Sequence, residues 1–127
     1  MRVVLVVDGD PAVGAHFRRA ARELDLQVAH AGSADEAWKL LFVHRPLAVF
    51  TEYRLLGFDG ISLLELVAQH FPAAKRILHT SEALGRWALG LDIPVLGKPC
   101  DEASLTGLLR SLERLTIGTA PALAKSG

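Results

Sequence analysis

Several residue types are scarce in this sequence of 127 residues, and each scarcity excludes a class of protein. The single cysteine, Cys100, excludes an intrachain disulfide and therefore a disulfide-stabilised scaffold. Fourteen basic residues balance fourteen acidic ones, so no net field attracts nucleic acid, an anionic membrane or an acidic substrate. No apolar run approaches the roughly 18 residues of a membrane-spanning helix, and no N-terminal segment resembles an export signal. We expect a cytoplasmic protein that binds neither nucleic acid nor membrane.

Half of the residues are hydrophobic, and a chain of this length can bury one sizeable core. We therefore expect one domain at residues 1–116. Residues 117–127 are mostly small and lack a hydrophobic period, which is typical of a flexible tail or the start of a linker.

Short apolar runs alternate with stretches of helical period along the domain. Five of these runs are predicted strands, at residues 2–7, 26–31, 47–51, 76–79 and 95–96. Five helices are predicted after them; Asp10, Ser33 and Asp101 have the positions of N-caps, residues 81–91 form a weaker helix, and the last helix ends near residue 115. This alternation predicts a doubly wound α/β fold, in which five helices flank a five-stranded parallel sheet.

Four polar side chains follow predicted strands of this sheet. Asp8 follows the first strand, Glu52 the third, Thr80 the fourth and Lys98 the fifth. Because ligands of such sheets collect at the carboxyl ends of the strands, we expect these four residues to lie together there. In isolation each has a plainer interpretation, as a solvated loop residue or a strand residue, and their convergence favours a site.

Four motifs surround these residues: VLVVDGDP at 4–11, EYRLLGFDG at 52–60, ILHTSE at 77–82 and LGKP at 96–99. In this order and spacing they resemble the receiver domain of bacterial two-component response regulators (CheY-like), over residues 2 to 115. The resemblance implies the strand order 2-1-3-4-5 and a cis peptide bond between Lys98 and Pro99.

The resemblance also implies roles for individual residues. In the family, an aspartate after the third strand takes a phosphoryl group from a histidine kinase, with Mg²⁺ held by that aspartate, an acidic pair after the first strand and a backbone carbonyl. Asp8 matches the first acid of the pair, and Arg54 supplies the carbonyl. Lys98 matches the phosphate-pairing lysine, and Thr80 matches the switch hydroxyl.

This sequence departs from the family pattern at three of these positions. Glu52 replaces the phosphoacceptor aspartate, Gly9 replaces a metal-binding acid, and Val95 replaces the switch aromatic. The interval of 18 residues from Thr80 to Lys98 is also short for the family, which puts the fourth helix in doubt.

These departures disfavour phosphoryl chemistry. The extra methylene of glutamate moves the carboxylate by roughly 1.5 Å, and phosphoryl transfer depends on positioning. Mg²⁺ needs near-octahedral oxygen ligands, and Asp10, which completes the acidic pocket with Asp8, is expected to cap a helix instead. We expect no cofactor, and weak or absent Mg²⁺ binding with Asp8, Glu52 and Arg54 as candidate ligands.

Three functions remain open. The favoured one is a non-enzymatic pseudo-receiver, a phosphorylation-independent interaction module whose Glu52 pairs with Lys98 and whose partner is a histidine kinase or a downstream signalling protein. The alternative is a working phosphoacceptor receiver. The third, a flavodoxin-like or nucleotide-binding enzyme, is disfavoured because Asp8, Gly9 and Asp10 offer carboxylates where a phosphate would need N–H donors.

Overall fold

The computed structural model describes residues 2–83 and 92–126, with side chains described through Arg114. Strands and helices alternate along the chain, and their bounds are β1 (Arg2–Val7), α1 (Pro11–Ala21), β2 (Leu26–Ala31), α2 (Ala34–His44), β3 (Ala48–Thr51), β4 (Arg54–Leu55), β5 (Phe58–Asp59), α3 (Gly60–His70), β6 (Lys75–Thr80), β7 (Val95–Gly97) and α4 (Glu102–Ser126).

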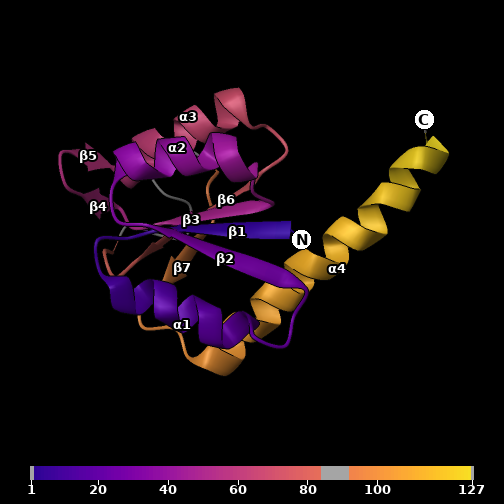
Figure 1. The fold of residues 1–127 in the computed structure, drawn as a ribbon, viewed down its shortest axis with the longest axis horizontal. Helices are drawn as coiled ribbons and strands as arrows, with labels where there is room; N and C mark the ends of the chain where they lie inside the picture. Colours follow the sequence, from indigo (N-terminus) through magenta and orange to yellow (C-terminus); the bar gives the residue numbers. More distant parts are fainter. Residues whose placement is uncertain (1, 84–91, 127) are drawn as a thin grey trace.

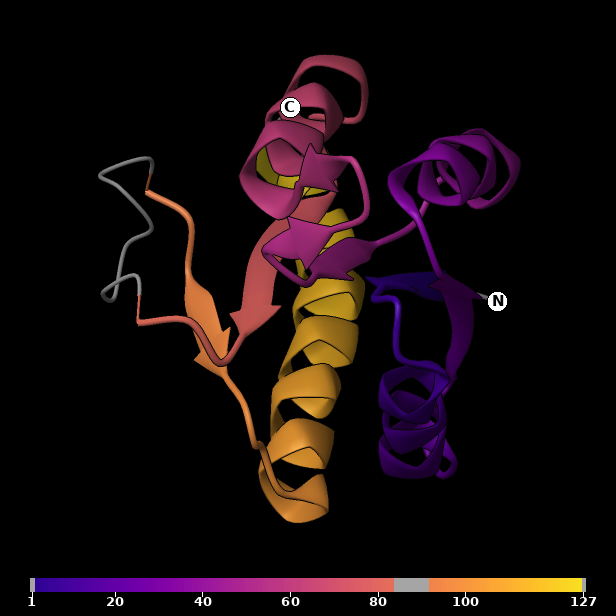
Figure 2. The same ribbon diagram turned by 90° about the vertical axis from the view of Figure 1, so that its left-hand side faces the viewer.

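The main sheet has five parallel strands in the order β2-β1-β3-β6-β7. This is the predicted order, since β6 and β7 are the fourth and fifth strands of that sheet. Helices α2 and α3 cover one face of the sheet, and α1 and α4 cover the other (Figure 1). Figure 2 shows β7 at the edge of the sheet and α4 running behind it.

The two sides of the sheet form two hydrophobic clusters because successive strand residues point to opposite faces. Leu5, Val7 and Val49 belong to the cluster on the side of α2 and α3. Val4, Val6 and Phe50 belong to the cluster on the side of α1 and α4. The central strands are therefore buried on both faces, as their continuous apolar runs indicate.

The predicted helix caps are present. The Asp10 side chain accepts a hydrogen bond from the Ala12 N–H, and the Ser33 hydroxyl accepts one from the Glu36 N–H. Asp101 accepts from the Ser104 N–H at the start of α4. Each cap accepts a hydrogen bond from a backbone N–H that has no partner within the helix. The caps therefore fix the residues at which the helices begin.

A small hairpin, not predicted from the sequence, lies between β3 and α3. Its two-residue strands β4 and β5 pair antiparallel around a turn at Leu56 and Gly57, where Gly57 has the positive φ of 73°. The hairpin returns the chain toward the end of β3, where the Gly60 N–H donates to the Tyr53 carbonyl at 2.7 Å. A Cβ atom at residue 60 would overlap the Glu52 carbonyl, so glycine permits this close approach.

Two predictions concern the number of helices and the end of the last helix. The described residues contain four helices rather than five, and the predicted helix at 81–91 falls on residues 84–91, which lie outside the described residues. Helix α4 continues to Ser126, although the sequence indicated an end near residue 115. Whether residues 117–127 are flexible stays a prediction. Within the described ranges, none of the helices is long and apolar enough to cross a membrane.

Candidate functional site

Lys98 joins two carboxylates at the carboxyl end of the sheet. Asp8 follows β1, Glu52 follows β3 and Lys98 follows β7, so parallel strands deliver all three residues to one edge. The Lys98 Nζ atom lies 2.6 Å from Asp8 Oδ2 and 2.8 Å from Glu52 Oε1. One ammonium group thus holds two carboxylates that would otherwise repel each other.

The cluster is largely shielded from water. The side chains of Asp8, Glu52 and Lys98 are 6%, 15% and 22% exposed. Two negative groups and one positive group leave a formal charge of −1 among these three residues. Burial of such charges is costly unless they are paired and hydrogen bonded, as these are.

Burial alone raises the pKa of Glu52, but hydrogen bonding to Lys98, Thr80 and the Tyr53 N–H, with the Lys98 charge, outweighs it and holds that pKa below its ordinary value. Burial lowers the pKa of Lys98, but hydrogen bonds and attraction from Asp8 and Glu52 raise it overall. Both shifts favour the charged forms, so the ion pairs persist at neutral pH.

Both oxygens of the Glu52 carboxylate have partners. Oε1 accepts from Lys98, and Oε2 accepts from the Tyr53 N–H and, at 3.4 Å, from the Arg54 N–H. Asp8 is fixed similarly, because its Oδ1 accepts from the Asp10 N–H at 2.9 Å. The carboxylate of Glu52 therefore folds back over its own loop.

Thr80, at the end of β6, and Glu82, in the loop after it, lie on the β6 side of the site. The Thr80 hydroxyl accepts from the Glu82 N–H at 3.2 Å. The Glu82 carboxylate binds the Arg54 guanidinium through two contacts, at 2.9 and 3.3 Å. This bidentate pair connects the loop after β6 to strand β4 of the hairpin. Glu82 was not predicted as a site residue, although it lies within the motif ILHTSE.

The remaining predicted residues lie outside the ion cluster. The exposed Asp10 caps α1. Val95 is half-buried and packs against the hydrophobic cluster beneath α2 and α3. The Lys98–Pro99 peptide bond is cis, as the resemblance implied.

The donor set fits Mg²⁺ poorly. Both candidate carboxylates bind an ammonium group, and Gly9 supplies no side-chain oxygen. Among the described residues there is no group of three or more His, Cys, Asp and Glu side chains that could hold a metal ion. A Cβ atom at residue 9 would meet only the Gly32 carbonyl oxygen, at 3.9 Å, so an acid could be accommodated there.

Two histidines that were not predicted as site residues hydrogen bond to the backbone next to the site. The His30 Nε2 atom lies 2.8 Å from the Asp8 carbonyl oxygen, and the His30 ring packs on Gly14 of α1. His79 is buried and its Nδ1–H donates to the Leu96 carbonyl at 2.9 Å. Burial lowers the pKa of His79, so the neutral ring is favoured.

Comparisons with known proteins agree with this fold. The family model described as response regulator receiver domain matches residues 4–110. A comparison with curated proteins finds no match.

Solved receiver structures superpose on most of the chain. A signal receiver domain of an HD domain-containing protein from Pseudomonas fluorescens is 25% identical, with a TM-score of 0.80 over 94% of this chain and 92% of that one. A CheY-like receiver domain protein from Methanospirillum hungatei is 20% identical, with a TM-score of 0.77 over 93% and 98%. The chemotaxis response regulator CheY4 of Vibrio cholerae is 18% identical, with a TM-score of 0.74 over 88% and 98%.

Proposed function

We propose, from the premise that the chain belongs to the response regulator receiver domain family, that it is a pseudo-receiver whose protein interactions do not depend on phosphorylation. Receiver domains are signalling modules that contact kinases and effectors, and we propose no catalytic activity for this one. Its partner is a histidine kinase or a downstream signalling protein.

One observation carries the proposal: Lys98 is bound by Glu52 and Asp8 together. Lys98 stands at the family's phosphate-pairing position, where a phosphoryl group would bring negative charge. Here Glu52 brings a carboxylate to 2.8 Å from the Lys98 Nζ atom. The charge that phosphorylation supplies transiently is thus supplied in part, and permanently, by the sequence.

The geometry of Glu52 disfavours attack on a phosphodonor. A nucleophilic carboxylate must present a free oxygen in line with the phosphorus atom, and both oxygens of Glu52 are hydrogen bonded. Glutamate also reaches roughly one C–C bond, about 1.5 Å, beyond an aspartate at the same backbone position. A displacement of about 1 Å costs on the order of a hundredfold in rate.

We further propose that Mg²⁺ binds weakly or not at all. A magnesium ion at this site would have to displace Lys98 from at least one carboxylate, and Gly9 would offer no replacement ligand. Asp10 is committed to its helix cap and lies on the exposed side of the loop.

A receiver that is not phosphorylated in response to a signal is expected to occupy one dominant conformation. A two-state shift needs interactions that differ between the states. Phosphorylation is one such interaction, and Val95 removes a second because it lacks the aromatic ring of the usual switch position.

The test is an amide NMR spectrum recorded with and without millimolar Mg²⁺ and acetyl phosphate. We expect the amides of residues 8, 9, 52 and 54 to stay unshifted. Saturable shifts with Mg²⁺ alone would show that another group, such as Asp10, completes a metal site, and shifts that also require acetyl phosphate would support the alternative, a working receiver in which Glu52 or Asp8 accepts phosphate. The presence of Thr80 and Lys98 at their family positions is the observation that favours that alternative.

A further inference from the structure

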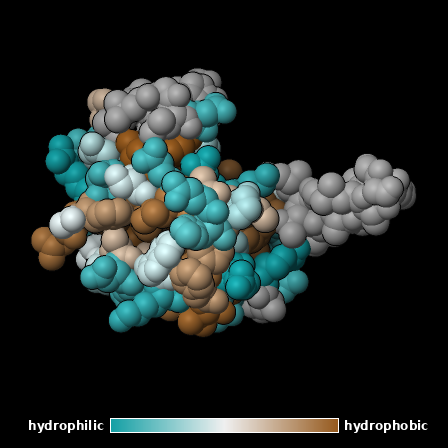
Figure 3. All heavy atoms as spheres, turned by 90° about the horizontal axis from the view of Figure 1, so that it is seen from above, coloured by the Kyte–Doolittle hydropathy of each residue, from teal (hydrophilic) through white to brown (hydrophobic). Residues whose placement is uncertain are grey.

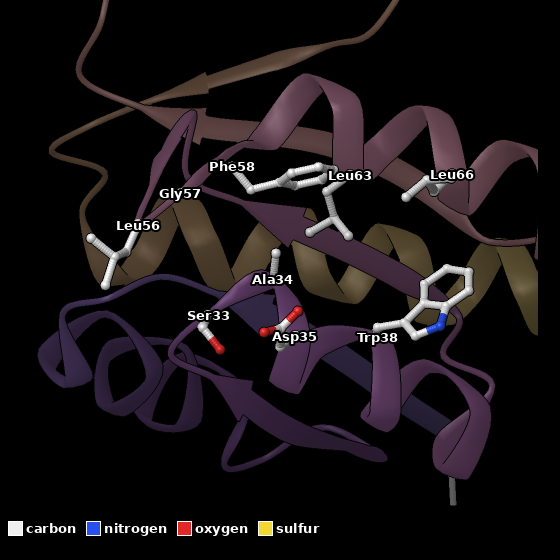
Figure 4. Close-up of a pocket in the computed structure, with 9 residues that line it drawn as sticks. All are labelled: Ser33, Ala34, Asp35, Trp38, Leu56, Gly57, Phe58, Leu63 and Leu66. Carbon is white, nitrogen blue, oxygen red and sulfur yellow. The ribbon is translucent and has the colours of Figure 1, made fainter.

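A groove lies between α2 and α3 and is bordered at one end by the β4–β5 hairpin (Figure 4). Its volume is about 420 Å³, enough for one or two large side chains. Six of its nine lining residues have apolar side chains and come from both helices and the hairpin, namely Ala34, Trp38, Leu56, Phe58, Leu63 and Leu66. None of them belongs to the ion cluster around Lys98.

Exposed apolar side chains gather on the elements around this groove. Within residues 2–83 and 92–114, the large apolar side chains that are exposed are Phe42, Val43, Leu56 and Phe58, all on α2 or the hairpin. Leu56 at the hairpin turn is 95% exposed. The rings of Trp38 and Phe42 are in edge contact at 5.0 Å, which extends the apolar surface along α2. Figure 3 looks onto this side and shows brown, hydrophobic surface between hydrophilic patches.

Two polar groups of α2 give the groove directional chemistry. Asp35 lines it, is exposed, and forms no ion pair with any described side chain. The Trp38 indole makes ring contacts, and its N–H has no hydrogen-bond acceptor in the described part of the chain. Figure 4 shows both residues on α2, with Phe58, Leu63 and Leu66 across the groove. The groove thus offers a negative charge beside an apolar wall.

We propose that this groove is a docking site for a short segment of a partner protein that carries a bulky apolar side chain close to a lysine or arginine. The apolar side chain would bury against Phe58, Leu63 and Trp38, and removal of its apolar surface from water would stabilise binding. The basic side chain would pair with Asp35.

The span of the groove sets the length of the segment. Ser33 and Trp38, the outermost lining residues at the start of α2 and on it, are five residues apart, which corresponds to about 7.5 Å at 1.5 Å per residue. Two helical turns or three extended residues cover that distance. A short linear motif is therefore sufficient. The other candidate occupant, an anionic lipid surface, is disfavoured because the negative charge of Asp35 would repel it.

Selection from a library of random peptides of about 12 residues, displayed against the whole protein, tests this proposal. We expect the enriched sequences to share a large apolar residue within a few positions of Lys or Arg. Binding is then measured by Trp38 fluorescence in Trp87→Phe protein, which retains Trp38 as its only tryptophan.

Matched variants locate the binding. Leu56→Ser and Asp35→Asn are each expected to weaken the selected peptides by about fivefold or more, equivalent to about 1 kcal/mol. Val43→Ser, also exposed and apolar on α2 but outside the groove lining, is the control and is expected to change nothing. Leu56 is so exposed that its substitution leaves the core intact.

Three results would overturn the proposal: no enrichment, enrichment of acidic peptides, or peptides whose binding is unaffected by Leu56→Ser and Asp35→Asn. Anionic vesicles that bind the protein through Leu56 would also overturn it, in favour of a membrane contact. None of these outcomes bears on phosphorylation of Glu52, so the groove and the pseudo-receiver proposal fail separately.

Discussion

At the scale of single residues, one methylene and one missing carboxylate define this site. Glu52 reaches Lys98 directly, and Gly9 leaves the loop after β1 without a second acid near the cluster. Exposed ion pairs contribute little, about 0–1 kcal/mol, whereas removing one partner of a buried pair costs about 3–5 kcal/mol. The Lys98 cluster lies between these limits because its members are 6–22% exposed.

Replacing Lys98 by methionine would leave Asp8 and Glu52 as two adjacent, mostly buried carboxylates. We expect the variant to lose about 2 kcal/mol of unfolding free energy at pH 7, as measured by urea denaturation. The pKa of Glu52 lies below its ordinary 4.5 in the folded protein, so its contribution is present above that value and is lost as the pH falls through the folded pKa. The difference between wild type and variant should therefore shrink in acid. An unchanged stability at pH 7 would show that the ion pairs contribute nothing.

The sequence predicted the meeting of Asp8, Glu52 and Lys98 because each directly follows a strand of a parallel sheet. It did not predict the Arg54–Glu82 pair or the contact of His30 with the Asp8 carbonyl. Those interactions depend on how far side chains reach across loops, and hydrophobic periodicity carries no information about that reach.

At the scale of elements, the caps and strands were predictable because their signals are local. Asp10, Ser33 and Asp101 each stand directly before a helical pattern, and the strands of the main sheet are continuous apolar runs. The β4–β5 hairpin was missed because two-residue strands are too short to show a period of two. Its function is to return the chain across Glu52, and Gly60 makes that return possible.

Replacing Gly60 by alanine should therefore damage this return. The added methyl group would overlap the Glu52 carbonyl and approach the Thr51 methyl to 3.2 Å. We expect a loss of about 1–3 kcal/mol in the free energy of unfolding, and altered amide shifts at Glu52 and Tyr53. Gly107→Ala is the matched control, since a Cβ atom there meets nothing within 4 Å. Equal effects of the two substitutions would contradict the close approach.

At the scale of the whole molecule, the sheet separates two hydrophobic clusters, and buried polar groups lie at one edge of it. Asp8, Thr51, His79 and Thr80 are the buried polar residues among those described, and all lie at or near the carboxyl ends of strands. The site is thus part of the folded core, and the stability of the whole protein should depend on the protonation of His79, the buried histidine of this set.

His79 makes that dependence measurable at mild pH. Burial, with a contribution from Lys98, lowers the pKa of His79 below its ordinary 6.5, although its bond to Leu96 and the charges of Asp8 and Glu52 oppose the shift. The unfolded chain then binds a proton more readily than the folded one, so stability is retained above pH 6.5 and falls as the pH drops below it. Denaturation midpoints measured from about pH 7.5 to pH 5 should decrease in wild type and change less in His79→Gln. Parallel curves for the two proteins would refute this assignment.

The central claim is that the fixed charge of Glu52 takes the place of phosphorylation. Intact mass measured after incubation with Mg²⁺ and acetyl phosphate tests it most directly. The comparison is between wild type and a double variant that combines Gly9→Asp with Glu52→Asp, because a side chain added at residue 9 has open space around it. We expect no phosphate adduct on the wild-type protein or on Glu52→Asp alone, and an adduct on the double variant. A stable phosphate adduct on the wild-type protein would contradict the account.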